Sequence, residues 1–241
     1  MPQHPSPVPP THNPGAEYDA MADAYNARVD TQPHNALYER PAVLSQLPPL
    51  AGLTILDAGC GSGWYAQHYL EHGAERVVCV DASEKMAAAA RVRLGGRAQV
   101  LVADLGQPLS FAAKGEFDLV AAPLVLHYLA DWLPTLREFH RVLKPNGRLV
   151  FSTHHPTMDF KLFDLPDYFA TTLIEDEWDT GKVTFYHHSL SAISAALAEA
   201  GFIIERLLEP QPVQAMHASH PELYDRLLHN PWFLVIRARR I

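Results

Sequence analysis

The sequence predicts an α/β fold in which helices cover both faces of a parallel sheet, and three observations support this. Short apolar runs alternate with helical patterns along most of the chain, which favours parallel strands joined by right-handed crossovers. Some of these runs are apolar on both faces, as VVCV is at residues 77–80. The first run leads directly into a glycine-rich turn, AGCGSG at residues 58–63, before a helical pattern begins.

Two helices are expected before the first strand. Residues 1–15 are rich in proline and polar side chains, and we expect them to form a disordered tail. Apolar residues at helical spacing then predict a helix over residues 16–28. A second helix is expected over residues 35–46, because Pro48 and Pro49 would end it.

Seven strands and the helices between them follow. The helices after the first two strands are expected to begin at Ser62 and Ser83, because a serine side chain can accept a hydrogen bond from a free N–H group of the first turn. The expected strands are residues 53–56, 76–80, 99–102, 117–121, 148–153, 202–208 and 232–238. The expected helices are residues 62–71, 83–94, 132–143 and 191–200.

Residues 156–188 interrupt this alternation. The segment is too long for a bare loop, and it carries seven aromatic side chains and several acids. A small extra strand is expected over residues 183–186. The aromatic side chains fit either a core under a long loop or a lid over a bound substrate, and the sequence leaves both open.

Composition limits the partners that the protein can bind. Of the 241 residues, 48% are apolar, and 27 acidic side chains outnumber 19 basic ones, for a formal charge of −8. A surface that binds nucleic acid or an anionic membrane normally carries a basic patch, so we expect neither partner. Three arginines near the C-terminus fit a solvated edge better than such a patch.

The sequence also shows neither a membrane span nor a signal peptide. No apolar run reaches about 18 residues, and the N-terminal residues lack the basic and apolar regions of a signal peptide. Cys60 and Cys79, the two cysteines, are too few for a disulfide framework in a chain of this length. We therefore expect a reducing, cytoplasmic setting.

Three glycines in the turn after the first strand predict a ligand site. Gly59, Gly61 and Gly63 lie between a strand and a helix, and residues without a Cβ let a ligand approach the backbone closely. The N–H groups at the start of a helix carry partial positive charge. We therefore expect a nucleotide-like cofactor at this edge of the sheet, although a tight turn without a ligand would also use glycine.

Carboxylates end three of the expected strands. Asp57, Asp81 and Asp104 would meet at the same crevice, since the carboxyl ends of parallel strands lie at one edge. Asp81 is placed to accept hydrogen bonds from ribose hydroxyls, and Asp104 suits the exocyclic amine of an adenine. Each could instead cap a helix or form a turn. Three acids would repel a pyrophosphate and favour a cationic or zwitterionic adenosine.

Five segments together resemble the class I S-adenosylmethionine-dependent methyltransferases. The glycine motif has the D-x-G-C-G-x-G form of that family rather than the G-x-G-x-x-G of dehydrogenases. The resemblance covers about residues 16–155, and its segments are LDAGCGSGWY, VVCVDAS, VLVADLGQPL, FDLVAAPLVLHYL and RVLKPNGRLVFSTHHP. It implies a Rossmann-like, doubly wound sheet of seven strands in the order 3-2-1-4-5-7-6, with the last strand antiparallel. It also implies S-adenosylmethionine as the cofactor and S-adenosylhomocysteine as its product.

The resemblance also implies which residues bind the cofactor. The glycines would line the methionine part, the acids would bind the amino group, the ribose and the adenine amine, and the tyrosines of a lid helix would close over the methionine end. Core packing is the alternative for both tyrosines. The implied cofactor-binding residues are Tyr18, Tyr25, Asp57, Gly59, Gly61, Gly63, Asp81, Ala82, Met86, Asp104, Leu105, Pro123 and Leu124. The chain would then be a single domain over residues 16–241, with N-terminal lid helices over 16–47 and a substrate lid over 156–188.

Histidines are the candidates for a general base, which is required only if the methyl acceptor must lose a proton. Neighbouring side chains of an extended segment point to opposite sides, so one histidine of each adjacent pair should face the site. We favour His127, His155 and His187, and hydrogen-bonded structural histidines are the alternative. No C-x-x-C or H-E-x-x-H pattern is present, so we expect no metal.

The expected substrate is a small organic molecule. The segment AAPLVLHYL departs from the N/D-P-P-Y/F motif of family members that methylate amino groups of bases or of glutamine. The sequence leaves open whether O, N, C or S is methylated and whether the protein is a monomer or a homodimer. Two other functions also stay open. One is a non-catalytic domain that binds S-adenosylmethionine, and the other is a nicotinamide oxidoreductase, which the glycine spacing and the missing Y-x-x-x-K pair disfavour.

Overall fold

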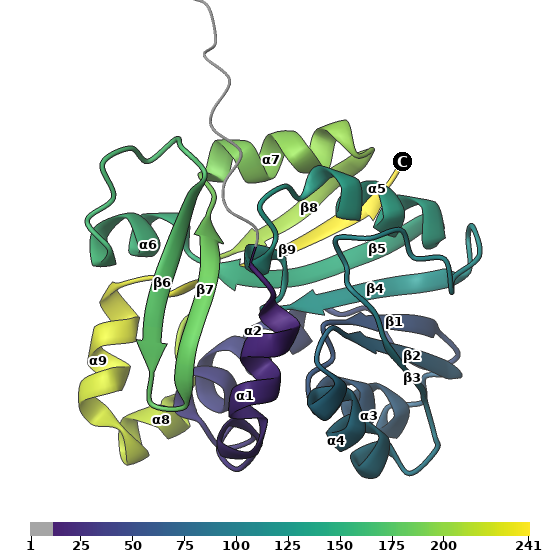
Figure 1. The fold of residues 1–241 in the computed structure, drawn as a ribbon, viewed down its shortest axis with the longest axis horizontal. Coiled ribbons are helices and arrows are strands. Elements are labelled where there is room, and N and C mark those ends of the chain that lie inside the picture. The colour runs from purple at the N-terminus through teal and green to yellow at the C-terminus, as the bar shows by residue number, and fades with distance from the viewer. Residues whose placement is uncertain (1–11) are drawn as a thin grey trace, which may run out of the picture.

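A seven-stranded sheet forms the centre of the computed structural model, which describes residues 12–241 (Figure 1). The first five strands pair in parallel, and the last strand of the chain runs antiparallel between its two neighbours. This confirms the expected order and the antiparallel last strand. In spatial order, the strands are β3 (Gln99–Val102), β2 (Arg76–Asp81), β1 (Thr54–Ala58), β4 (Phe117–Pro123), β5 (Leu143–His154), β9 (Phe233–Arg240) and β8 (Phe202–Leu208).

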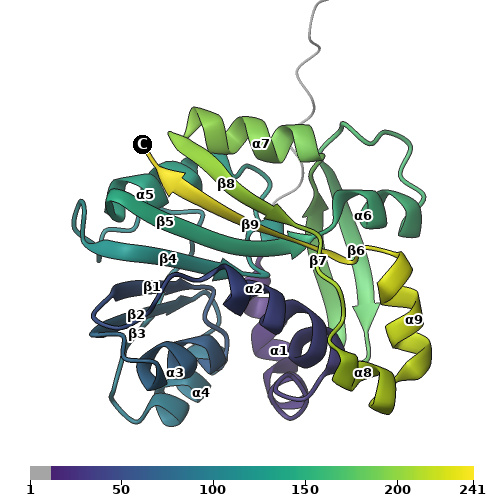
Figure 2. The ribbon, with the colours of Figure 1, turned by 180° about the vertical axis from the view of Figure 1, so that it is seen from behind.

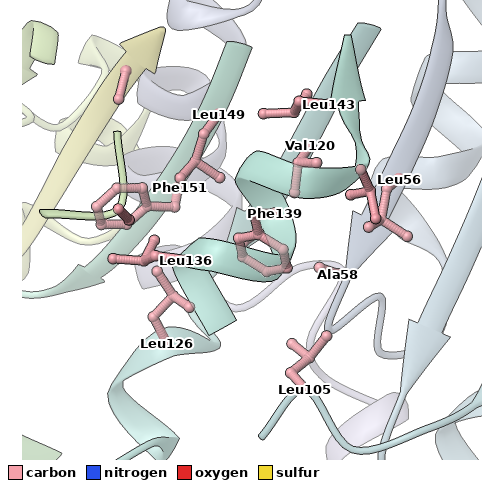
Figure 3. Packing of buried hydrophobic residues seen from close by; sticks show 14 of the residues in the cluster. Leu56, Ala58, Leu105, Val120, Leu126, Leu136, Phe139, Leu143, Leu149 and Phe151 are labelled. Atoms are coloured by element: carbon pink, nitrogen blue, oxygen red, sulfur yellow. The ribbon is translucent and has the colours of Figure 1, made fainter. Parts of the chain in front are cut away.

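Helices cover both faces of this sheet, and a separate apolar core lies under each group of helices (Figure 1). Successive side chains of a strand point to opposite faces, so Leu56 of β1 joins one core and Ile55 the other. Figure 3 shows Leu136 and Phe139 of one covering helix directed at the Leu56 side of the sheet. One face is covered by α5 (Leu133–Val142) and α7 (Leu190–Glu199), and the other by α2 (Arg40–Gln46), α3 (Trp64–Glu71) and α4 (Glu84–Leu94).

Of the two serine caps expected from the sequence, one is confirmed and the other is wrong. The Ser83 hydroxyl accepts a hydrogen bond from the Met86 N–H at 3.0 Å, so the expected cap of α4 is confirmed. The expected cap of α3 by Ser62 is wrong, because the capping position belongs to Gly63, which has φ 82° and makes no side-chain cap. A Cβ at Gly63 would lie 3.2 Å from the Cβ of Ala90, so this glycine allows the close packing of α3 on α4.

The N-terminal helices lie close to their expected positions. α1 (Pro14–Asn26) begins two residues earlier than expected, because the Asn13 side chain accepts a hydrogen bond from the Ala16 N–H. Two residues assigned to the disordered tail, 14 and 15, are therefore helical, residues 12 and 13 are described directly before the helix, and residues 1–11 of that prediction lie outside the described residues. The second expected helix consists of a π-helical turn, η1 (Asn35–Glu39), that continues into α2.

The segment 156–188 forms more structure than the single small strand expected. It contains α6 (Pro156–Leu162) and an antiparallel hairpin, β6 (Thr172–Trp178) with β7 (Gly181–His187), which is not part of the main sheet. The hairpin lies across the carboxyl ends of β4 and β5, beside α1 (Figure 1).

Three short helices were not expected at all. η2 (Leu126–Tyr128) follows β4, and α8 (Gln214–Ser219) and α9 (Pro221–His229) lie between β8 and β9. Figure 2 shows α8 and α9 at the same end of the molecule as the hairpin. Within residues 12–241, none of the helices combines the length and the apolar character that crossing a lipid bilayer would require.

Candidate active site

A cavity of about 460 Å³ opens where β1, β2, β4 and β5 end, between the sheet, α1 and the hairpin. Two sets of residues with different chemistry line it. We call the first set the glycine half; it consists of Gly59, Gly61, Asp81, Ala82, Met86, Asp104 and Leu105. We call the second set the histidine half; it consists of His127, His154, Met158, Phe163, Trp178 and Phe185.

The glycines of the turn serve different purposes. Gly61 has φ 54°, and a Cβ placed there would meet no atom within 4 Å, so its backbone faces open space in the cavity. A Cβ at Gly59 would lie 2.4 Å from Val125, so this glycine makes room for a neighbouring loop. Gly63 packs on α4 and does not line the cavity. Close approach of a ligand to the backbone is therefore possible at Gly61.

The Asp81 carboxylate holds the glycine turn in place and still faces the cavity. One oxygen accepts a hydrogen bond from the Gly61 N–H at 2.8 Å, and the other accepts one from the Ser83 N–H at 2.9 Å. Burial raises the pKa of Asp81 above its usual value. Each carboxylate oxygen can accept more than one hydrogen bond, so Asp81 can also receive hydroxyl groups of a ligand.

An apolar surface with an acid at its edge lies next to Asp81. Ala82 and Met86 come from the start of α4, and Asp104 and Leu105 follow β3. Asp104 accepts a hydrogen bond from the Gly106 N–H at 2.8 Å. Such a surface can hold a flat ring and accept a hydrogen bond from an amino group on it.

Asp57 lies behind the glycine turn and does not line the cavity. Asp57 is only 1% exposed, and one of its carboxylate oxygens has no hydrogen-bond partner among the described residues. Burial, with the charge of Asp81 nearby, raises the pKa of Asp57 to about 7. The structure therefore does not bring Asp57 together with the other expected cofactor residues.

Helix α1 covers the glycine half. Gly15 rests against the backbone of Ala82, since a Cβ there would lie 2.5 Å from the Ala82 carbonyl oxygen. The Asp19 carboxylate accepts hydrogen bonds from the Ser83 hydroxyl at 2.5 Å and the Lys85 N–H at 3.0 Å. These contacts fix α1 against the start of α4.

Both tyrosines of α1 line the cavity and are also packed. The hydroxyl groups of Tyr18 and Tyr128 lie 2.7 Å apart, and the ring of Tyr25 contacts the Tyr18 ring edge to face. Pro123 and Leu124 line the cavity after β4, as expected. Leu124 has φ 49°, and its N–H donates to the Ser152 hydroxyl at 3.0 Å, which holds this strained residue at the wall.

A polar group from η1 and α2 also lines the cavity and was not predicted from the sequence. The Glu39 carboxylate accepts hydrogen bonds from the Ser152 hydroxyl at 2.5 Å and the Tyr65 hydroxyl at 2.8 Å, and burial raises its pKa. Arg40 lies over the Trp64 ring at 4.3 Å, and both residues line the cavity with Glu39. The sequence signal that could have revealed this group is the pair of adjacent charged residues, Glu39 and Arg40, within an apolar helical pattern, because charged side chains are rarely buried unless they are paired.

The histidines that reach the cavity are only partly the expected ones. His34, His127 and His154 line it, and the rings of His127 and His154 stack at 4.3 Å with an angle of 16°. Burial and neighbouring histidines hold the pKa of His127 well below its usual value.

His155 and His187 do not line the cavity, contrary to expectation. β5 extends through His154, one residue further than predicted, so it is His154 that faces the cavity. His155 instead caps α6 and contacts Glu209 at 2.9 Å. His187 is fully buried, with Nε2 at 2.8 Å from the Tyr168 carbonyl oxygen.

Comparisons with known proteins identify the class. Residues 56–151 match the family described as a methyltransferase domain. A demethylmenaquinone methyltransferase of Lactococcus lactis is 32% identical over 179 residues, which cover 68% of this chain and 69% of that protein. The crystal structure of an S-adenosylmethionine-dependent methyltransferase from Mesorhizobium loti matches with a TM-score of 0.69 at 32% identity, over 84% of this chain and 97% of that one.

The chain therefore belongs to the class I S-adenosylmethionine-dependent methyltransferases, and its cofactor is S-adenosylmethionine. An uncharacterized protein of Haemophilus influenzae is similar over a greater length, with 31% identity over 231 residues that cover 86% of this chain and 89% of that one. The glycine half fits this cofactor, because it offers open space at Gly61, a carboxylate for hydroxyl groups and an apolar surface edged by an acid.

Replacing Asp57 by Asn should change how stability depends on pH. The folded-state pKa of Asp57, about 7, is raised above the ordinary 3.8, so wild type loses stability as the pH rises through this window. The variant carries no charge there, and unfolding by urea at about pH 5 and about pH 7.5 should show wild type losing about 2 kcal/mol more than the variant. Equal losses in both proteins would contradict the raised pKa.

Replacing Gly61 by Asn should weaken binding of S-adenosylhomocysteine by on the order of tenfold or more, because the side chain would occupy the open space at the turn. Asn tolerates positive φ better than other residues, so the fold should survive. Gly95→Ala and Gly95→Asn are matched controls, because Gly95 has φ 56° with nothing within 4 Å and does not line the cavity. Calorimetry should show wild-type affinity in both controls, and wild-type affinity in Gly61→Asn would mean that this backbone faces no ligand.

Proposed function

We propose that the protein transfers the methyl group of S-adenosylmethionine to a small organic acceptor by in-line displacement. The observation that carries this proposal is a single cavity that joins the glycine half to the histidine half. A domain that only binds the cofactor has no need of a second, differently lined space beside it. The nicotinamide oxidoreductase considered from the sequence is not supported by the family to which the chain belongs.

The glycine half would hold the cofactor. Asp81 would accept the ribose hydroxyls, Asp104 the adenine amine, and Gly61 would lie against the methionine part. Their positions in one cavity and their free acceptor capacity support these roles. The other residues that we assign to the cofactor are Tyr18, Tyr25, Gly59, Ala82, Met86, Leu105, Pro123 and Leu124, all of which line the cavity.

The histidine half would hold the acceptor. Its walls are mostly aromatic and apolar, with the hairpin acids Asp176, Glu177 and Asp179 beside Trp178, which favours a planar, largely apolar molecule. The name of the Lactococcus relative specifies an acceptor with a quinone ring, which is of this physical kind. The enzyme would act mainly by aligning the acceptor with the methyl group and by excluding water.

The net charge indicates which acceptors are favoured, and the two thiols indicate the redox environment of the protein. A formal charge of −8 supports an acceptor other than a nucleic acid. Cys60 and Cys79 are both free, which is in keeping with a reducing, cytoplasmic setting.

A screen for S-adenosylhomocysteine production tests the proposal. Purified full-length protein would be incubated with S-adenosylmethionine and a panel of phenols, quinols, enols, amines and thiols. Turnover of at least one member is the expected result. Binding of S-adenosylhomocysteine with no turnover across the panel would favour the non-catalytic alternative.

Replacing Trp178 by Ala should slow turnover of an acceptor found in this screen by about tenfold, because Trp178 belongs to the histidine half. Affinity for S-adenosylhomocysteine should stay within about threefold, or roughly 0.7 kcal/mol. Phe169→Ala is the control, since Phe169 belongs to the same insertion but is 72% exposed and does not line the cavity. Equal turnover in both variants and wild type would remove the hairpin from the acceptor site.

A further inference from the structure

A buried carboxylate lies directly behind the histidine half, between two imidazoles. Asp159 of α6 has a side chain only 3% exposed, and it does not line the cavity. One of its oxygens lies 3.6 Å from His154 Nδ1, and the other lies 4.0 Å from His187 Nδ1. Among the described residues, neither Nδ1 atom has a hydrogen-bond partner, and the Asp159 oxygen facing His154 has none.

The protonation of His187 follows from its other contact. Its Nε2 lies 2.8 Å from the carbonyl oxygen of Tyr168, and a carbonyl can only accept a hydrogen bond. Nε2 therefore carries a hydrogen. The Nδ1 edge of the ring lies against the second oxygen of Asp159 at 4.0 Å, so the buried ring limits where this carboxylate can lie.

The tautomer of His154 follows from the same carboxylate. Nδ1 of His154 is directed at an acceptor, so the neutral ring is most stable with its hydrogen on Nδ1. Nε2 then carries the lone pair. At 3.6 Å the contact is longer than a formed hydrogen bond, and contacts of this kind shorten when a catalytic site is occupied.

We propose that His154 is the general base for methyl transfer, and that Asp159 and His187 are positioning residues which hold it in the Nδ1–H tautomer. This inference rests on the proposed function. The acceptor gives the hydrogen of its nucleophilic atom to Nε2 of His154, and the freed electron pair forms the new bond to the methyl carbon. The bond between carbon and sulfur breaks with its electrons left on sulfur, which becomes a neutral thioether. Asp159 stabilises the imidazolium that forms.

The cavity is also lined by Tyr128 and by the hairpin acids Asp176, Glu177 and Asp179, and the other imidazole of the histidine half is His127. It stacks on His154 at 4.3 Å, and burial together with neighbouring histidines lowers its pKa well below the usual value. It therefore stays neutral beside a charged His154. The other rings packed on His154, Phe185 and Phe233, carry no charge.

The pairing of His154 with Asp159 indicates which chemical class of methyl acceptor the site would use. A thioether or a tertiary amine already has a free lone pair and no hydrogen to lose, so it needs no base. A base held by a carboxylate in an apolar, aromatic wall suits an acceptor whose nucleophilic atom carries an ionisable hydrogen, such as a phenol or an enol.

Imidazole NMR of the full-length protein with S-adenosylhomocysteine bound tests the protonation pattern. The ¹⁵N signals, assigned with single His→Gln variants, should show a hydrogen on Nδ1 of His154 and on Nε2 of His187. In Asp159→Asn, the share of His154 in the Nδ1–H tautomer should fall, because the charge that faces Nδ1 is lost. Asp225→Asn is the matched control, since it removes the carboxylate of the exposed pair with His229, and it should leave His154 unchanged.

Kinetics separate a positioning role from a structural one. With an acceptor found in the screen, Asp159→Asn should lower kcat by on the order of a hundredfold and leave KM within about threefold. Raising the pH should not restore the rate, whereas Asp159→Glu should recover part of it. His154 with its hydrogen on Nε2, or a tautomer ratio that Asp159→Asn leaves unchanged, would overturn the proposal. Calorimetry with S-adenosylhomocysteine tests the cofactor site separately. Cofactor binding and turnover without the expected effects at His154 would contradict only the assignment of the base, whereas absence of turnover would contradict the proposed function.

Discussion

The Asp81 carboxylate connects the segments on which the cofactor site depends. It accepts hydrogen bonds from the turn after β1, at Gly61, and from the start of α4, at Ser83. The Ser83 hydroxyl then donates to Asp19, which ties α1 to the same point. One side chain at the end of β2 thus fixes the turn, the helix that follows β2 and the helix that covers the cavity. Because Asp81 is buried, these donors also offset part of its desolvation.

Buried carboxylates set the electrostatic character of the cavity. Burial raises the pKa of Asp57, Asp81 and Glu39, the charge of Asp81 adds to the rise at Asp57, and the charge of Asp19 adds to the rise at Asp81. An added anion would increase this repulsion, whereas a positive charge would decrease it. The acids that the sequence shows at the strand ends therefore explain why this glycine turn suits a sulfonium cofactor rather than a dinucleotide with its pyrophosphate.

The strands and the meeting of their carboxyl ends could be predicted because they depend on local patterns, whereas the strand order followed from the resemblance to the family. Apolar runs mark the strands, and the residues at their carboxyl ends must meet at one edge of a parallel sheet. The histidine half depends on details that such patterns do not carry. One extra residue in β5 exchanges His155 for His154, and the three consecutive acids Glu175, Asp176 and Glu177 disguised β6. The contacts of Glu39 with Ser152 and Tyr65 join residues far apart in the chain, so only the folded structure reveals them.

The hairpin β6–β7 shares no strand pairing with the main sheet, and this has a consequence for how such proteins diverge. The segment that matches the family, residues 56–151, contains the glycine turn and the first four strand ends, but not the hairpin or α6. Substitutions and changes of length in the hairpin leave the register of the seven strands untouched. Proteins that descend from one ancestor can therefore keep the same methyl donor while changes in the hairpin alter which molecules fit against the opposite wall.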